Sequence, residues 1–467
     1  MFKRAIISLV IVAAGSLALF ATAATPASVE GPAQQGLTLA EAVERARRQD
    51  PWLQGSLLRQ QALAADSVAA GSLPDPVVSL GVANLPTDTF EFNQEPMTQF
   101  KLGVMQSFPR GDSRALGQER LTVLSEQQKL LRQERRAQVS VIVAGLWLDA
   151  YRAQESIHQI EADRGLFEYL LEVTQSNYSH VVGQTRQQDV IRAQLELTRL
   201  DDRVTGLRQQ QETALGKLGE WLGPAYQSEG AVDWRRAMAW DLPDLNPVLP
   251  ELEVISAKEV LSVTGPAADW LSQSLLLHPA IRSLEQNIAA SEVSVDLAKQ
   301  KYRPQWGVNA GYGYRDDAPT GAARADFFSV GVSFDLPLFT GQRQDQEVAS
   351  AAASAEAGRT EKWLALRTMR AGFDSQRARL LRLNQREALY RDQLIGQLRD
   401  QAESALNAYT NDDGDFAEVV RARIDELNAR IDVLAIRIER LRSIVQLNYY
   451  LSGRRASEPA DTTEAAS

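Results

Sequence analysis

Alternation of apolar and polar residues marks four short segments of the chain. Residues 76–85 (PVVSLGVANL) place Val78, Leu80 and Val82 on one face of a strand and small residues on the other. Residues 98–108 (TQFKLGVMQSF) alternate in the same way, and two further segments do so around 305–314 and 328–336. A period of two predicts β-strands, here of about ten residues with one apolar face and one small or polar face.

Long stretches with helical spacing follow each pair of strands. The segment 111–182 contains no proline, and from Val139 onward its apolar residues recur at alternating steps of four and three, with Arg164 and Thr174 as polar breaks. After a polar turn at 183–186, residues 187–222 return with the same spacing. Such seams predict left-handed coiled coils.

The second half of the chain has the same helical plan. Its turn is NDDGD (411–415), and its return seam runs from Val420 to Val445. Each half also opens with one continuous helical stretch, 37–73 in the first half and a stretch that ends near Tyr302 in the second. The pattern predicts a fold that is mainly α, with long coiled-coil helices and a smaller β portion.

The two halves match each other in sequence. A shift of 228 residues aligns Pro51 with Pro279 and Gly103 with Gly331, whereas VIRA (190–193) matches VVRA (419–422) at a shift of 229. We interpret the chain as two copies of one unit. The predicted parts are a signal peptide (1–23), a first repeat (24–223), a Pro-rich linker (224–264), a second repeat (265–453) and a disordered tail (454–467).

The start of the chain has the features of a secretory signal. Lys3 and Arg4 precede an apolar run, 5–20, and Ala21-Thr22-Ala23 offers a cleavage site. The run is short for a permanent membrane helix, and the remaining sequence contains no second one of its kind. We therefore expect the mature chain to cross the inner membrane.

Composition excludes several classes of function. The net charge of −10, from 50 Lys+Arg and 60 Asp+Glu, argues against a nucleic-acid partner. Cysteine is absent and only three histidines occur, so we predict no metal site, no cofactor and no thiol chemistry. Nucleophile-elbow, zinc-protease and phosphate-loop motifs are also missing, and we expect a protein that is not an enzyme.

The strands suit an outer membrane. A tilted strand of about 9–11 residues spans an outer membrane, with its apolar face toward lipid. Four strands cannot close a barrel, because the smallest membrane barrels have about eight. Lipid tolerates no open strand edge, so several chains must share one barrel. Three chains would give a 12-stranded β-barrel continued by a 12-helix α-barrel. Prolines fall where strand should meet helix, at Pro76, Pro109, Pro304 and Pro337.

These features together resemble the TolC-type outer-membrane factors of Gram-negative efflux and secretion systems. The resemblance rests on the duplicated unit, the aligned prolines and the turn sequence VGQTRQQDVIRAQ (182–194), and it covers residues 37–453. Within that family, LPDPVVSLGVANLP and MTQFKLGVMQSFP look like the subgroup that serves heavy-metal efflux pumps. Some members of that subgroup carry an N-terminal lipid on cysteine, which this chain lacks.

The resemblance implies a location and a set of partners. The protein would be a homotrimer in the outer membrane with a long periplasmic extension, and the linker would contribute to a belt around the helical tunnel. A periplasmic adaptor protein and an inner-membrane pump of the proton-driven RND type would be its partners. The function expected is passive conduction of heavy-metal cations out of the periplasm.

Both predicted turns contain candidate site residues. In the second turn, Asp412, Asp413 and Asp415 flank Gly414, and threefold symmetry would gather these carboxylates around an entrance and favour cations. The same residues are good turn formers and helix caps, a role compatible with the first. The family closes its entrance with Tyr and Arg links; Tyr409 matches the Tyr, whereas Asp415 stands where the Arg is expected.

The first turn matches the family's docking tip for the adaptor at Gly183, Gln184 and Thr185, and Gly414 is its counterpart in the second turn. Three alternative functions remain open at this point. The chain could be a duct for organic solutes and drugs, a duct for a secreted protein, or, from a different class, a periplasmic coiled-coil adaptor without a barrel.

Overall fold

A computed structural model describes residues 36–180, 187–224, 244–262, 264–411 and 414–455. These residues belong to one compact unit, Gly36–Ser467. The predicted signal peptide (1–23) and most of the predicted tail lie outside the described residues. The fold below therefore concerns the two predicted repeats and part of the linker between them.

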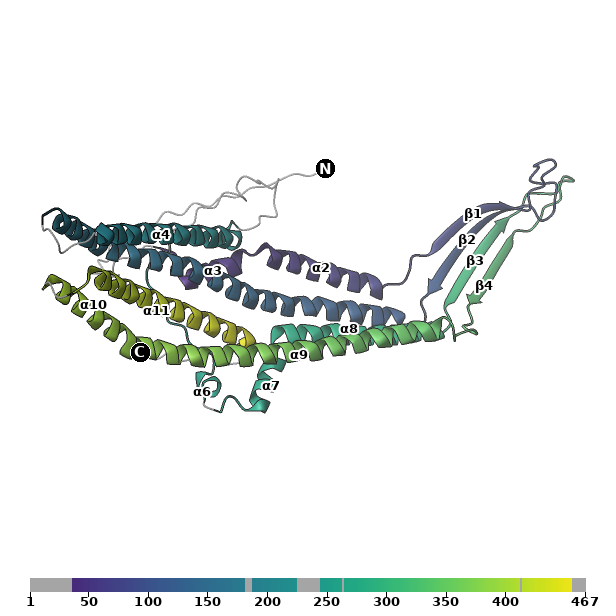
Figure 1. The fold of residues 1–467 in the computed structure, drawn as a ribbon. Helices are drawn as coiled ribbons and strands as arrows, with labels where there is room; N and C mark the ends of the chain where they lie inside the picture. Colours follow the sequence, from purple (N-terminus) through teal and green to yellow (C-terminus); the bar gives the residue numbers. More distant parts are fainter. Residues whose placement is uncertain (1–35, 181–186, 225–243, 263, 412–413, 456–467) are drawn as a thin grey trace, which may run out of the picture. The chain divides into compact units, whose positions relative to one another are not determined.

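Four strands form one antiparallel sheet in the order β1-β2-β3-β4 (Figure 1). Leu80 pairs with Leu102, Leu102 with Tyr312, and Tyr312 with Phe328, so the apolar positions of all four strands share one face. The predicted strands and their alternation are thus confirmed. Their bounds are β1 Val77–Ala83, β2 Gln99–Phe108, β3 Trp306–Tyr314 and β4 Phe327–Phe334.

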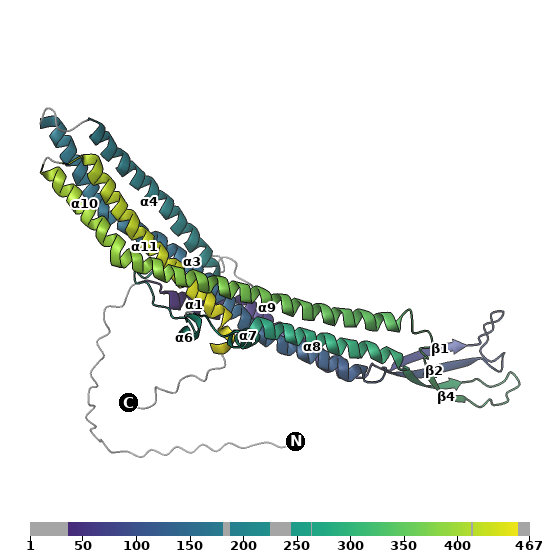
Figure 2. The ribbon, with the colours of Figure 1, turned by 60° about the horizontal axis from the view of Figure 1, so that its bottom comes forward.

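Long helices follow each strand pair. Helix α3 (Ser113–His180) has 68 residues, and α4 (Gln187–Leu222) returns along it. Helix α2 (Pro51–Gly71) also contacts α3, so two shorter helices accompany the long one (Figures 1 and 2). Both the proline-free long helix and the return helix were predicted from the seam, and both are confirmed.

The second series of elements has the same order. Helix α9 (Gln344–Leu389) is continued by a π-helical turn, η2 (Tyr390–Leu394), and by α10 (Ile395–Thr410). Helix α11 (Phe416–Tyr450) returns and contacts both α9 and α10. The ribbon changes direction between α9 and α10 (Figures 1 and 2). No such turn interrupts α3.

The prediction of one continuous opening helix in each half was wrong. In the first half α1 (Leu39–Gln49) ends before Asp50, and α2 begins at Pro51. In the second half α7 (Ala268–Leu276) precedes α8, which begins at Pro279 and ends in the 3₁₀ turn η1 (Gln300–Tyr302). A proline ring disfavours the α conformation at the residue before it, and ψ is accordingly 111° at Asp50 and 133° at His278.

The residues before these prolines also cap the helices that follow. Asp50 Oδ1 accepts a hydrogen bond from the Trp52 amide at 3.0 Å, and His278 Nδ1 accepts one from the Ala280 amide at 3.2 Å. Each break therefore satisfies an amide that a helix start would leave without a partner.

The predicted linker contributes to the core. Leu37 forms a parallel bridge to Leu245, and Val254 and Val260 are buried in the main apolar cluster. Val260 ends the short helix α6 (Ala257–Val260). Helix α12 (Ser452–Arg455) extends past residue 453, the predicted end of the second repeat.

The coiled-coil seams are buried as the spacing predicted. In α3 the buried seam residues include Val143, Ala150 and Ile157, and in α11 they include Leu427 and Ile438. A second apolar cluster lies nearer the turns, where α3, α4, α10 and α11 meet. Tyr409 and Phe416, on either side of the second turn, contribute to this cluster together with Leu170 of α3 and Ala193 of α4.

Candidate functional site

The second turn is built tightly around Gly414. A Cβ on this glycine would lie 2.7 Å from the Tyr409 backbone nitrogen and 2.9 Å from the Ala408 carbonyl carbon. Such distances leave no room for a side chain, so the close return of the chain onto α10 requires glycine. Asp412 and Asp413 lie outside the described residues.

Asp415 acts as the N-cap of α11. Its Oδ1 accepts a hydrogen bond from the Ala417 amide at 3.1 Å, and its backbone is extended. Capping is one of the two roles that the sequence indicates for this carboxylate, and the geometry supports it directly.

Tyr409 packs at the end of α10. Its ring lies 5.7 Å from the ring of Phe416 at an angle of 61°, in an edge-to-face contact between α10 and α11. The Tyr409 hydroxyl is buried and has no hydrogen-bond partner among the described residues. A hydroxyl of this kind costs about 1–3 kcal/mol until it finds a partner.

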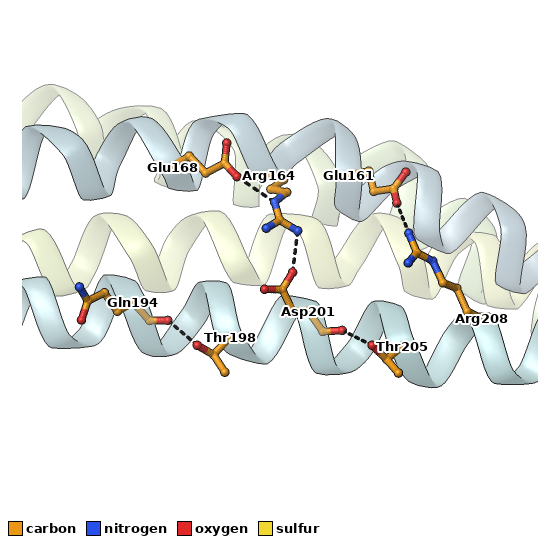
Figure 3. A network of polar contacts seen from close by, with 8 residues as sticks. All are labelled: Glu161, Arg164, Glu168, Gln194, Thr198, Asp201, Thr205 and Arg208. Carbon is orange, nitrogen blue, oxygen red and sulfur yellow. Dashed lines mark hydrogen bonds and ion pairs between the residues drawn. The ribbon is translucent and has the colours of Figure 1, made fainter.

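The candidate docking residues of the first turn, Gly183, Gln184 and Thr185, lie outside the described residues. The helices on either side are described, and ion pairs join them (Figure 3). Arg164 of α3 contacts Glu168 on its own helix at 2.8 Å and Asp201 of α4 at 2.6 Å.

A second ion pair joins the same two helices. Arg208 of α4 contacts Glu161 of α3 at 3.1 Å (Figure 3). Hydrogen bonding to Glu168 and then to Asp201 raises the pKa of Arg164. The sequence analysis identified Arg164 as a polar break in the seam. In the structure its ion pair with Asp201 joins α3 to α4.

Helix α11 is tied to this first pair of helices as well. Arg430 forms an ion pair with Asp163 of α3, and Arg203 of α4 donates a hydrogen bond to Asn428 Oδ1 at 2.7 Å. Side-chain contacts therefore join α3, α4 and α11 near the turns.

The four predicted junction prolines all lie between strand and helix. Pro76 precedes β1, Pro109 follows β2, Pro304 lies between η1 and β3, and Pro337 follows β4. None of them interrupts a hydrogen-bonded ladder, as expected from the missing N–H.

Polar contacts connect the junctions of the two halves. Arg110 forms an ion pair with Asp335 and donates to the Arg303 carbonyl at 3.0 Å, and Arg303 contacts Asp112 at 3.1 Å. Gly111 lies inside this group with a φ of +45°. The sequence analysis did not identify this network, although Gly111 between two charged residues at the end of a strand was a signal for a tight turn.

The sheet exposes its apolar face and both edges. Leu80 is 68% exposed and Val330 is 63% exposed, although both occupy central positions of their strands. Among the described residues, β1 and β4 each pair on one side only. Large apolar side chains and open edges on one sheet indicate a surface that other molecules cover.

A buried polar group lies at the break before α8, and sequence reasoning missed it. His278 is fully buried; its Nε2 lies 3.0 Å from the Tyr449 carbonyl, and its Nδ1 lies 3.5 Å from Glu134 Oε2. The Tyr449 hydroxyl donates to Glu134 Oε1 at 2.6 Å. Burial lowers the pKa of His278, whereas burial and the Glu134 charge raise the pKa of Tyr449.

The described residues offer neither a membrane-spanning helix nor a cluster of metal ligands. Among the helices that the structure describes, none combines the length and the apolar character needed to cross a bilayer. Within the described ranges, no group of three or more histidine, cysteine or acidic side chains could hold a metal ion.

Comparison with known proteins gives a likeness in structure only. No protein-family model matches the chain, and no curated protein sequence matches it either. The outer-membrane channel OprN is 19% identical, with a TM-score of 0.68 over 89% of this chain and 90% of OprN.

Two other solved structures have comparable TM-scores. VceC, an outer-membrane protein of Vibrio cholerae, is 15% identical with a TM-score of 0.69, over 88% of this chain and 95% of VceC. The Campylobacter jejuni outer-membrane channel CmeC is 14% identical with a TM-score of 0.70, over 92% of this chain and 90% of CmeC. The chain therefore has the fold of these outer-membrane channels, as the TolC-type resemblance predicted.

Proposed function

We propose that this protein is the outer-membrane exit channel of a tripartite efflux system in a Gram-negative bacterium. The observation that carries the proposal is the four-stranded sheet, with its exposed apolar face and its two unpaired edges, next to long coiled-coil helices. The likeness to outer-membrane channels in fold supports it.

The dimensions of the sheet suit a membrane. Strand β2 has 10 residues and extends about 33 Å at ~3.3 Å per residue. A tilt of about 45° leaves a height of about 23 Å, close to the ~25 Å apolar band of outer-membrane barrels. The face that carries Leu80, Leu102 and Tyr312 would contact lipid, and the glycine- and serine-rich face would line the lumen.

The open edges require more than one chain. Every backbone amide and carbonyl in lipid needs a partner, so β4 of one chain would pair with β1 of the next. Three chains supply twelve strands, enough for a water-filled barrel, and their long helices would continue it as a tunnel into the periplasm. The apolar sheet face favours this channel over a periplasmic adaptor, which would have no lipid to cover that face.

Transport through such a channel would be passive, with energy supplied by an inner-membrane pump of the RND type and with a periplasmic adaptor between the two. The docking site for the adaptor would be the first turn, at Gly183, Gln184 and Thr185, together with Gly414. We expect replacement of Gly183 by Trp to abolish export and to leave the trimer intact. Normal export by this variant would contradict the docking role.

We propose heavy-metal cations as the cargo, because the second turn offers Asp412, Asp413 and Asp415 and the chain is acidic overall, with a net charge of −10. The test is the cellular content of zinc, cobalt, nickel and copper, and of a dye substrate, in a strain that lacks the gene. Raised metal with unchanged dye supports the proposal. Raised dye with unchanged metal would assign the channel to organic solutes.

The channel itself is tested with purified protein. We expect trimers that resist SDS, fractionate with the outer membrane and conduct ions in planar bilayers. A soluble protein that does not conduct would overturn the proposal and favour the adaptor.

A further inference from the structure

A cavity of about 700 Å³ lies beside the break between α1 and α2. Residues of α1, α2 and α3 line it, so three helices border the same space. Its volume falls within the range of about 300–1,000 Å³ that is typical of small-molecule sites. Four of the lining side chains are arginines, namely Arg47, Arg48, Arg132 and Arg136.

The acidic residues of the cavity do not balance these four charges. Asp50 is already paired with Arg135, which contacts it at 2.7 Å. Glu44 contacts Arg48 at 2.7 Å and lies 3.9 Å from Arg47, so one carboxylate serves two arginines. The four arginines less the charge of Glu44 leave a surplus of three positive charges in the cavity, on a chain whose net charge is −10.

The two arginines of α3 form no ion pair within the described residues. Arg132 donates hydrogen bonds to Ser56 Oγ at 3.3 Å and to Gln60 Oε1, and both of these acceptors are neutral. The guanidinium of Arg136 has neither a hydrogen bond nor an ion pair in the described part of the chain. Burial, and then repulsion by Arg136, lower the pKa of Arg132. An anion bound between the two side chains would relieve this repulsion.

Arg47 contributes a nitrogen without a partner. Its Nε atom is buried and donates to no acceptor that the described residues provide. A buried donor costs free energy until it finds an acceptor, and the cost is larger when the donor belongs to a charged group. An oxygen atom of a bound ligand would be such an acceptor.

The second predicted repeat has a cavity at the same place with a different lining. The shift of 228 aligns the four arginines, in chain order, with Leu275, Leu276, Thr360 and Leu364. The three leucines line a cavity of about 890 Å³ between α7 and α9. Because the same plan of helices accepts leucine and threonine at these positions, the fold does not require the arginines of the first repeat.

We propose that the cavity beside the break between α1 and α2 binds a small polyvalent anion, one that carries two or more phosphate or carboxylate groups. Guanidinium groups bind both kinds of group through paired hydrogen bonds, and the surplus of three charges favours a polyvalent ion over chloride. One bound ligand would bridge the arginines of α1 to those of α3 and hold the break against the long helix. This site goes beyond the proposed channel function, because its ligand stabilises the chain and is not the cargo.

The first test measures binding to the purified protein in detergent. The probes are inorganic pyrophosphate and citrate, one for each chemical class, and the reference is sodium chloride at the same ionic strength. We expect isothermal titration calorimetry to detect one of the probes, and the Tm to rise with its concentration, because a ligand that binds only the folded chain stabilises it. The probe that binds more tightly identifies the class as phosphate or carboxylate. Binding of neither probe, or a Tm that rises equally in chloride, would overturn the proposal.

The second test uses substitutions that the second repeat already contains. Arg136→Leu reproduces Leu364 and removes a side chain without a partner, so we expect it to fold normally and to bind the probe at least about tenfold more weakly. Arg132→Thr reproduces Thr360 and should weaken binding in the same way. The matched control is Arg367→Gln, which removes an arginine from the lining of the second cavity and should leave the affinity unchanged.

The outcomes separate a ligand site from other roles of the arginines. Unchanged affinity in Arg136→Leu, or an equal loss in Arg136→Leu and Arg367→Gln, would contradict the site, since the second result indicates attraction by net charge alone. A lower Tm or yield of trimer for Arg136→Leu without any added anion would also contradict it, and would assign the arginines to the contact between chains. Conduction in planar bilayers tests the proposed function separately, and none of these results alters it.

Discussion

His278 and Asp50 occupy equivalent positions 228 residues apart, and each lies between two helices and caps the second. Two consecutive residues of α3 contact them. Arg135 forms an ion pair with Asp50 at 2.7 Å, and Glu134 lies 3.5 Å from His278. One point on the long helix therefore supports both breaks.

The buried histidine predicts a pH dependence. Burial lowers the pKa of His278 below its ordinary value of 6.5, despite the opposing effect of Glu134 and of the Tyr449 carbonyl. As the pH falls below about 6.5, the unfolded chain takes up a proton that the folded chain refuses, so stability decreases toward the folded pKa. We expect the Tm to fall between neutral and mildly acidic pH.

The variant His278→Asn tests the origin of this effect. Asparagine can still cap α8 through its side-chain oxygen, but it does not titrate. We expect the variant to lose part of the decrease in Tm on acidification, measured by circular dichroism at a series of pH values. An identical pH profile for variant and parent would assign the effect to other groups.

A second prediction concerns Gly111. Its φ of +45° and the position of Arg303 Cδ, 2.5 Å from where a Cβ would be, leave alanine strained and crowded. We expect Gly111→Ala to destabilise the protein by about 1–3 kcal/mol. The matched control is Gly145→Ala inside α3, where a Cβ meets nothing within 4 Å and should stabilise by about 0.5–1 kcal/mol. A rise in Tm for both variants would refute this account of Gly111.

At the level of elements, we predict which of the two faces of the sheet contacts lipid. Leu102 lies on the apolar face in the middle of β2, and Asn309 lies on the opposite face of β3. We expect Leu102→Arg to cost about 2–4 kcal/mol in the membrane and to reduce the yield of trimer, because its charge would lie in lipid. Asn309→Arg should be tolerated. Equal yields would contradict the assignment of the faces.

Most elements followed from the sequence because their periodicity is strong. The alternation in 76–85 and the seam that begins at Val139 each indicate one type of structure. The breaks before Pro51 and Pro279 were missed because apolar spacing continues across them. The interruption was indicated only by the ψ preference of the residue before each proline. That preference concerns one residue at a time and does not change the apolar spacing.

The candidate site was less accessible to sequence reasoning. Asp415 as a cap and Gly414 as a tight turn could be anticipated from residue type. The ion pairs of Arg164 and Arg430 could not be anticipated, because they depend on which faces of distant helices pack together.

At the level of the whole molecule, the repeat predicts how chains meet. Within one chain Val104 of β2 pairs with Ala310 of β3. Applying the shift of 228 to both strands pairs Val332 of β4 with Val82 of β1 in the next chain. Both residues lie on the apolar face, as this pairing requires.

The absence of cysteine makes this pairing directly testable. We expect the double variant Val82→Cys, Val332→Cys to form covalent trimers on oxidation, detected by gel electrophoresis without reductant. The control, Val82→Cys with Phe328→Cys, displaces one thiol by four residues and should remain uncrosslinked. Efficient crosslinking of both variants, or of neither, would contradict the predicted register.

In the proposed trimer, the two open edges of the sheet would also affect how the channel is made in the cell. A chain that needs strands from two others would be unable to complete its membrane portion alone, so its stability would depend on how many chains are present. The amount of channel should then rise more steeply than the amount of protein synthesised, and at low expression much of the chain would remain as a precursor exposed to periplasmic proteases and chaperones. For this protein, gene dosage itself would act as a control on export.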